Sequence, residues 1–353
     1  MFDLLITSGR VVDGSGLPWY RADVAIAGDR IAAVGPLASA QARTRIDAAG
    51  KVVAPGFVDA HVHGDLMLLA DPYHEPAIRQ GVTTYLLGQD GVAMAPASPA
   101  TLAYMRRYTA GFSGNPDLKE ARPLQEAGFL SVADYLALFD RRTAVNVATL
   151  VPNGNVRMEA MGLATRPPTA DELRHMRRLV REGMEQGAVG LSSGLDYIPS
   201  RYADADELAA LCQEIAPFGG VYVTHMRRYA PDGVLEAMDE VYRIGREGGC
   251  PVHISHFNSR ADLVLPKLDA GRAAGTDVTY DLYCYLAGSS ILGMVALPPW
   301  VQEGGVEATV ERLRDPAVRR RLREPFAAPR GPLGEVRLRY VAAPAFRHLE
   351  GLT

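Results

Sequence analysis

The chain has 353 residues, of which 48% are hydrophobic and 22% charged, as is usual for a globular protein with a sizeable core. Its net charge of -4 does not suit a general nucleic-acid-binding protein, which would be basic. There is no apolar run of 18 residues, so we expect no membrane partner, and the N-terminus does not resemble a signal peptide. Three widely spaced cysteines favour a reducing, cytoplasmic location over a disulfide framework.

The first 54 residues predict short β-strands at 3–7, 10–12, 23–27 and 30–34. Gly28-Asp29, between the last two strands, is typical of a hairpin turn. Residues 51–55 would lead out of this region. An all-β segment of this size is too small to be a full domain by itself.

From about residue 56, short apolar strands alternate with amphipathic helices. We expect strands at 56–60, 82–87, 146–151, 189–191, 221–224, 251–255 and 277–282, and helices that include 170–186, 204–218 and 234–247. Thr169 with Glu172, and Asp204 with Glu207, have the spacing of capping boxes. This alternation indicates an α/β fold with a parallel sheet, and seven strands in series fit a (β/α)₈ barrel better than a doubly wound sheet. No dinucleotide fingerprint or P-loop follows any strand.

Five side chains with metal-ligating chemistry follow these predicted strands. They are His61 and His63 after the first strand, Asp90 after the second, His225 at the end of the fifth and His256 at the end of the sixth. Residues two apart on a strand share a face, and the C-terminal ends of barrel strands meet at one rim. The joint placement predicts a metal site, although the HxH pair alone would be weak evidence.

Imidazole and carboxylate ligands suit zinc, nickel, cobalt or manganese, and zinc is the usual choice for hydrolysis because it polarises a carbonyl group and activates water. The remaining histidines are expected to have structural or surface positions; they are His74, His175, His253 and His348. His253 lies three residues before His256, so it is predicted to point to the opposite face of the strand.

Six stretches, in this order, resemble the N-acyl-D-amino-acid deacylases (D-aminoacylases) of the amidohydrolase superfamily. They are PGFVDAHVHGD at 55–65, GVTTYLLGQDG at 81–91, GAVGLSSGLDYIPSRYA at 187–203, GGVYVTHMRRY at 219–229, PVHISHF at 251–257 and DVTYDLYCYLAGSS at 277–290. The resemblance covers essentially the whole chain. It implies a (β/α)₈ barrel with about seven of its eight strands in residues 55–353, and a small β-sandwich of which residues 1–54 form a part.

The resemblance also implies how the metal ligands are grouped. His61 and His63 would hold one metal position, and His225 and His256 the other. Asp90 would bridge the two positions, where many relatives have a cysteine. Other amidohydrolases use a carboxylated lysine on the fourth strand, but that strand reads VGLSSGL here, without lysine.

The family binds the α-carboxylate of its substrate with tyrosine and serine side chains at the barrel mouth. Tyr197, Tyr283 and Ser289 stand at the matching positions. Relatives usually have a lysine two residues after the sixth-strand histidine, where this chain has Asn258. We expect this change to weaken binding of the carboxylate or to alter the acyl-amino acid accepted.

The function implied is hydrolysis of an N-acyl-D-amino acid to a D-amino acid and a carboxylate, with one tightly bound zinc and at most a second, weaker ion. In relatives, sequence beyond the equivalent of Thr353 includes an eighth strand with a metal-ligating, proton-transferring aspartate. We therefore expect a truncated deacylase that contains no catalytic aspartate of this kind, is of low stability and has weak or no activity. Two alternatives stay open: a cyclic-amide hydrolase of the dihydroorotase or hydantoinase type, and an inactive metal-binding fragment. The oligomeric state and acyl group are not indicated.

Overall fold

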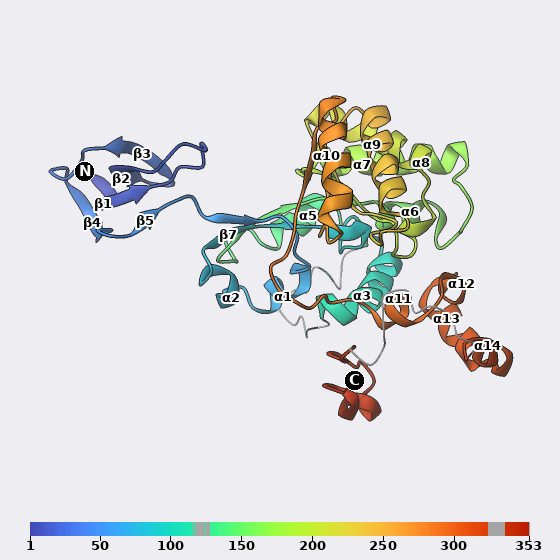
Figure 1. Cartoon of the computed structure of the whole chain (residues 1–353). Coiled ribbons are helices and arrows are strands. Elements are labelled where there is room, and N and C mark those ends of the chain that lie inside the picture. The colour runs from blue at the N-terminus through green and yellow to red at the C-terminus, as the bar shows by residue number, and fades with distance from the viewer. Residues whose placement is uncertain (115, 117–123, 125–127, 324–335, 353) are drawn as a thin grey trace. The chain divides into compact units, whose positions relative to one another are not determined.

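The computed structural model describes residues 1–114, 116, 124, 128–323 and 336–352. Its internal contacts divide the chain into two compact units, Met1–Phe57 and Val58–Thr353, which we describe separately (Figure 1). Among the described residues, no helix combines the length and apolar character needed to cross a membrane.

The N-terminal unit is a single mixed sheet. Its strands are β1 (Phe2–Val11), β2 (Tyr20–Ala27), β3 (Arg30–Gly35), β4 (Ala42–Asp47) and β5 (Val52–Val53). They are arranged in the order β3-β2-β1-β4, and β5 also pairs with β1. The hairpins β1–β2 and β2–β3 are antiparallel, whereas β4 and β5 run parallel to β1.

The structure corrects two strand predictions in this unit. The predicted strands 3–7 and 10–12 merge into one strand, β1, which ends at Val11 and whose pairing with β2 shifts register between Ile6 and Gly9. Ser8, at this irregularity, has φ of 64°, and its N–H donates to Asp23 Oδ1 (2.8 Å). Strand β4 was not predicted because its sequence, ARTRID, is mostly polar and exposed, without the apolar alternation that identifies a strand.

The second unit contains all seven predicted strands of the parallel series. They are β6 (Phe57–Asp59), β7 (Val82–Leu87), β8 (Asn146–Thr149) with β9 (Val151–Pro152), β10 (Gly190–Gly194), β11 (Val221–His225), β12 (Val252–Ile254) and β13 (Val278–Tyr280). The order within the sheets is β6-β7-β8 and β9-β10-β11-β12-β13. Only Leu150 separates β8 from β9, and its N–H donates to Leu87 O (3.0 Å).

The strand series follows chain order and curves back on itself. The recorded strand pairs from β7 to β13 are all parallel. His61, just after β6, lies 3.7 Å from Asp281, just after β13, so the C-terminal ends of the first and last strands approach each other. The predicted α/β fold with parallel strands in series is therefore confirmed for this part of the chain, and the approach of its first and last strand ends is the arrangement that a barrel requires.

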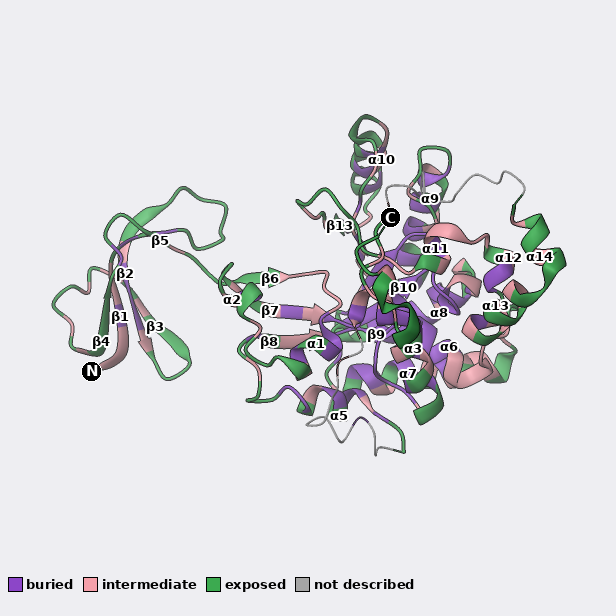
Figure 2. Cartoon of the chain, turned by 90° about the horizontal axis from the view of Figure 1, so that it is seen from below, coloured by how far each residue is buried: buried purple, intermediate pink, exposed green. Residues whose placement is uncertain are grey.

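Helices connect and cover these strands. They are α1 (Asp65–Ala70), α2 (Glu75–Ile78), α3 (Pro99–Ser113), α5 (Val132–Ala137), α6 (Asn153–Met161), α7 (Ala170–Glu185), α8 (Ala205–Ile215), α9 (Val234–Gly248), α10 (Ala261–Ala273), α11 (Leu292–Ala296), α12 (Pro299–Gln302), α13 (Gly305–Arg314) and α14 (Pro316–Arg321). The main core lies where α7, α8 and α9 pack on β9–β12, with Val180, Leu208 and Tyr222 among its fully buried side chains (Figure 2).

The start of α7 agrees with the sequence prediction, and the start of α8 agrees only in part. Thr169 and Glu172 form the predicted capping box. Asp204 caps α8 by accepting from the Glu207 N–H (2.8 Å), as expected. The Glu207 side chain, however, makes a buried ion pair with Arg157 of α6 instead of completing a capping box.

Candidate metal centre

The five predicted metal-ligating residues all lie at the C-terminal ends of parallel strands. His61 and His63 follow β6, His225 is the last residue of β11, and His256 follows β12. Asp90 belongs to the short 3-10 helix η1 (Gln89–Gly91), directly after β7. Because parallel strands present their C-terminal ends at one edge, these five side chains converge from four strands.

The turn after β7 depends on glycine. Asp90 has φ of 57°, and its neighbours Gly88 and Gly91 have φ of 78° and 66°. A Cβ atom on Gly88 would lie 2.4 Å from Leu150 O, and one on Gly91 would lie 2.8 Å from Ser200 Oγ. Only glycine suits both the left-handed backbone and this close approach, so the GQDG sequence itself places Asp90 at the centre of the rim.

The Asp90 carboxylate stands among four imidazoles. Its Oδ1 atom lies 3.7 Å from His61 Nε2 and 3.8 Å from His256 Nε2. Its Oδ2 atom lies 3.3 Å from His63 Nε2 and 3.7 Å from His225 Nδ1. Ligand atoms of His61, Asp90 and His256 all lie within 4.8 Å of one another.

Burial and charge oppose each other at this site. Burial raises the pKa of Asp90, but the surrounding histidines outweigh it and hold the pKa of this carboxyl well below its usual range. Burial lowers the pKa of His61 to about 4. Burial also lowers the pKa of His256, but the adjacent Asp90 carboxylate reverses the effect, so that the pKa is raised. An ionised carboxylate and a neutral imidazole are the forms in which these groups bind metals.

The donor set fits a divalent cation. Two atoms that each lie about 2.1 Å from a tetrahedral zinc are separated by roughly 3.4 Å, close to the spacings around Asp90. Within the described residues, Asp90 Oδ1 is buried without a hydrogen-bond partner, which is costly for a polar atom that has no other use. Imidazole nitrogen with carboxylate oxygen is a donor set that zinc accepts.

Aromatic rings enclose the histidines. The ring of Tyr197, a predicted substrate-binding residue, is buried with its centroid 5.0 Å from that of His225. Phe112 of α3 lies 4.5 Å from His63, and Tyr229 lies 5.2 Å from His225, again between ring centroids. The sequence analysis did not identify Phe112 or Tyr229, because neither occupies a strand end.

The other two predicted substrate-binding residues lie in the segment after β13. The hydroxyl of Tyr283 accepts a hydrogen bond from Asn258 Nδ2 (3.1 Å), and its ring stacks on Tyr285 with centroids 4.7 Å apart. Asn258, the position where relatives have lysine, is thus in contact with Tyr283. Ser289 is exposed before α11, and its binding role stays a prediction.

Two further residues, neither of them proposed as a site residue from the sequence, lie next to the site. Asp281 Oδ2 lies 3.7 Å from His61 Nδ1 and 2.9 Å from His253 Nε2. His253 was expected to have only a structural position. The strand register indicates the contact between His253 and Asp281. His253 pairs with Thr279, and Asp281 lies two residues beyond Thr279 on the same face.

A model of the amidohydrolase family matches residues 44–330 of this chain. The chain belongs to this family. It is 40% identical over 306 residues to a D-aminoacylase from Alcaligenes xylosoxydans xylosoxydans, covering 82% of this chain and 59% of that protein. The chain therefore spans about three-fifths of the length of that curated relative.

Two solved structures of deacylases have the same fold. One is a D-aminoacylase whose binuclear metal centre is activated by one metal and attenuated by a second; it is 37% identical, with a TM-score of 0.72, over 84% of this chain and 62% of that one. The other is the N-acyl-D-glutamate deacylase of Bordetella bronchiseptica with zinc and a phosphonate mimic of the tetrahedral intermediate. It is 36% identical, with a TM-score of 0.69, over 80% of this chain and 59% of that one.

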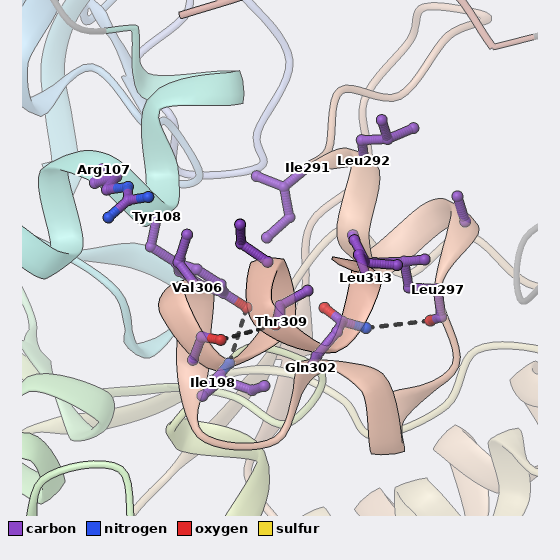
Figure 3. Close-up of a pocket in the computed structure, with 14 residues that line it drawn as sticks. Arg107, Tyr108, Ile198, Ile291, Leu292, Leu297, Gln302, Val306, Thr309 and Leu313 are labelled. Atoms are coloured by element: carbon purple, nitrogen blue, oxygen red, sulfur yellow. Dashed lines mark hydrogen bonds between the residues drawn. The ribbon is translucent and has the colours of Figure 1, made fainter. Parts of the chain in front are cut away.

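An apolar cavity of about 350 Å³ lies between α3 and the helices α11–α13 of this amidohydrolase (Figure 3). Ile198, Ile291, Ala296 and Val306 are among its lining residues, and the Tyr108 hydroxyl at its wall accepts from the Ile198 N–H (3.0 Å). Ile198 directly follows Tyr197 in the sequence. Tyr108 and Ile198 of the cavity wall therefore belong to one buried cluster with Tyr197, against which Phe112 and Ile291 also pack.

Proposed function

We propose that this chain is the metal-binding part of a hydrolase that cleaves the amide bond of N-acyl-D-amino acids, releasing a D-amino acid and a carboxylate. The observation that carries the proposal is the convergence of four histidines on the buried Asp90 carboxylate. The 40% identity to a D-aminoacylase supports this substrate class over other amides. A small N-acyl-D-amino acid would be the partner of the site.

Each side chain has a distinct role in this proposal. His225, His256 and Asp90 would hold one zinc tightly, while His61 and His63 with Asp90 would hold a second ion more weakly. Zinc, when bound, supplies Lewis acidity for a carbonyl group and lowers the pKa of water. Asp90 is suited to the shared position because each of its oxygens faces two imidazoles.

The remaining site residues would bind and orient the substrate. Tyr197, Tyr283 and Ser289 would contact its carboxylate through their hydroxyl groups. Tyr197 is the best supported of the three, since its buried ring lies against His225. Phe112 and Tyr229 cover two histidines with apolar rings, which limits the access of bulk water and strengthens electrostatic interactions at the site.

We also propose the domain organisation and location that the sequence suggested. Residues 1–54 would be part of a β-sandwich, and residues 55–353 would form the hydrolase barrel. The single sheet of the N-terminal unit, with exposed Ile31, Val34 and Ile46, is compatible with this assignment. Three free cysteines, Cys212, Cys250 and Cys284, support a cytoplasmic location.

A substrate panel tests the proposed function. The zinc-loaded protein is incubated with N-acetyl-D-methionine, N-acetyl-L-methionine and a 5-substituted hydantoin, and released amine is measured. Because this chain is expected to have at most weak activity, we expect a low rate of turnover, with the D compound alone. Calorimetric titration gives a readout that needs no turnover, and there the D compound should bind at least about tenfold more tightly than the L compound, as expected of a chiral site with several contacts. Preference for the hydantoin, or equal binding of both enantiomers, would contradict the proposal.

The apolar cavity offers a place for an apolar group of the substrate. Ala296→Trp would fill part of the space between α11 and α13. We expect this change to lower kcat/KM for N-acetyl-D-leucine by about 10- to 100-fold, because an apolar pocket discriminates by roughly that factor per lost contact group. The kcat/KM for N-acetyl-D-alanine should change little.

Ala317→Trp, at an exposed position of α14, is the matched control and should leave both substrates unaffected. An equal loss for leucine and alanine substrates in Ala296→Trp would instead show that the cavity has no part in selecting the substrate.

A further inference from the structure

We propose that Asp281 and His253 form a positioning pair that holds two of the proposed metal ligands, His61 through its ring and His256 through its backbone. Asp281 follows β13 and His253 lies in β12, so the pair connects the end of the strand series to its beginning at His61. The inference rests on the proposed metal centre and adds two residues to it.

The contacts of Asp281 divide between its two oxygens. Oδ1 accepts a hydrogen bond from the His256 N–H (2.6 Å). Oδ2 faces His61 Nδ1 at 3.7 Å and His253 Nε2 at 2.9 Å. The Asp281 side chain is only 16% exposed, so these interactions are partly shielded from water.

The backbone contact accounts for an unusual conformation. His256 has φ of 35°, a left-handed value that is uncommon for residues other than glycine. Its N–H is held by Asp281 Oδ1, and the backbone of Asp281 is itself fixed by bonds to Ile254 O (3.1 Å) and from Phe257 N (2.8 Å). Asp281 therefore stabilises the turn that directs the His256 ring toward Asp90.

The ring contact sets which nitrogen of His61 is available. Nε2 of His61 faces Asp90 and must carry no proton if it is to bind a metal. Nδ1 must then carry the proton, and the carboxylate next to it is Asp281. Metal-binding histidines commonly donate their second N–H to a carboxylate in this way, which fixes both the tautomer and the ring orientation.

His253 holds Asp281 in place from the other side. Its Nε2 lies 2.9 Å from Asp281 Oδ2, and its Nδ1 lies 2.7 Å from Thr279 Oγ1. With Nδ1 accepting from the threonine hydroxyl, Nε2 carries a proton and donates to the carboxylate. Thr279, His253 and Asp281 are thus joined by hydrogen bonds, and Asp281 Oδ2 faces His61 Nδ1 at 3.7 Å.

The substitution Asp281→Asn separates the two roles of the carboxylate, which are to accept from the His256 N–H and to face the His61 ring. The amide oxygen can still accept from the His256 N–H, so the turn is preserved. The amide NH₂ takes the place of Oδ2 and presents a donor instead of an acceptor to His61 Nδ1, which favours the tautomer whose Nε2 is protonated and cannot bind a metal. We expect zinc affinity at the position that includes His61 to fall by about 10- to 100-fold, the usual effect of losing such a partner.

Zinc affinities are measured on the whole chain by competition with a chromophoric chelator, together with the Tm of each variant. His253→Ala should weaken zinc binding in the same direction, and His253→Gln, which retains an N–H donor, should weaken it less. Asp277→Asn, at an exposed position before β13, is the matched control and should bind zinc like the wild type. The nitrogen chemical shifts of ¹⁵N-labelled histidine in the zinc-loaded protein report the tautomer directly.

The outcomes distinguish this inference from the proposed function. If the wild type binds zinc and Asp281→Asn binds it equally well, the positioning role is wrong and the metal centre stands. The role is also wrong if zinc affinity falls only in proportion to Tm, or falls equally in Asp277→Asn. A wild-type chain that binds no zinc would overturn the metal centre and, with it, the inference.

Discussion

Replacing both His225 and His256 with alanine is expected to change a chain that binds about one zinc tightly into one that retains none. Each of these imidazoles faces Asp90, and together with it they form the proposed tight position. A zinc site with a full set of protein ligands has an apparent binding free energy of about 10–16 kcal/mol, so the loss of two ligands should weaken binding by at least roughly a thousandfold. Metal content after dialysis against a weak chelator measures the effect.

The control for this experiment removes two histidines elsewhere. His175 lies on α7 beside Arg178, and His348 is exposed near the C-terminal end of the chain. The double variant His175→Ala with His348→Ala should retain zinc like the wild type. If the His225 and His256 double variant retains as much zinc as this control, the ligand assignment is wrong.

The positions of the five candidate ligands could be predicted because each depends on local sequence. An HxH pair after an apolar strand places His61 and His63 on one face, and a histidine that ends a strand must lie at the rim. GQDG predicts a turn because its glycines permit positive φ, which the structure shows at Gly88 and Gly91. Strand order then brings these ends together, so no long-range information was needed.

The supporting residues could not be predicted in this way because their roles depend on packing between distant segments. Phe112 reaches His63 from α3, and Tyr229 reaches His225 from the loop after β11. Asp281 falls within the predicted strand 277–282 and directly follows β13, but its approach to His61 requires the strand series to curve through the whole unit. This closure depends on tertiary packing, and the hydrophobic periodicity of the sequence gives no information about it.

The strand predictions also differ between strands that have a local sequence pattern and a strand that depends on a distant partner. Strands β7 and β11 are rich in apolar and β-branched residues, and their bounds were predicted to within one residue. The predicted strand 189–191 covers only the start of β10, because that strand continues through the buried but polar Ser192 and Ser193. Strand β4 is held by parallel pairing to β1 rather than by burial, with Ile6 opposite Ile46. The polar sequence of β4 does not indicate a strand, because the partner that stabilises it is 40 residues away in the chain and pairs through backbone groups.

The buried ion pair between α6 and α8 should have the largest effect on stability. Arg157 and Glu207 are 0% and 1% exposed in their side chains. Arg157 Nη2 also donates to Arg166 O (2.6 Å), so the guanidinium is surrounded by acceptors. Glu207→Gln leaves the arginine charged and buried without its counterion, and arginine cannot lose its proton. We expect the free energy of unfolding at pH 7 to fall by about 3–5 kcal/mol.

Removing Arg157, the other partner of the ion pair, should lower the free energy of unfolding by less, and the size of this loss should depend on pH. Burial raises the pKa of Glu207, and the Arg157 charge opposes that rise. In Arg157→Met the opposition is gone, so the carboxyl can take up a proton and remain buried in its neutral form. A folded-state pKa above the unfolded value stabilises the folded form below the unfolded pKa, and this contribution is lost as pH rises through the folded pKa.

Urea unfolding at pH 5 and pH 7 measures both effects. Relative to the wild type, Arg157→Met should lose less stability at pH 5 than at pH 7, whereas the loss in Glu207→Gln should be similar at both. Glu182→Gln removes the partner of Arg178 in an exposed pair on α7 and should cost under about 1 kcal/mol. If Glu207→Gln costs no more than this control, then Arg157 gains its compensation from the backbone carbonyls of residues 164 and 166 rather than from the carboxylate.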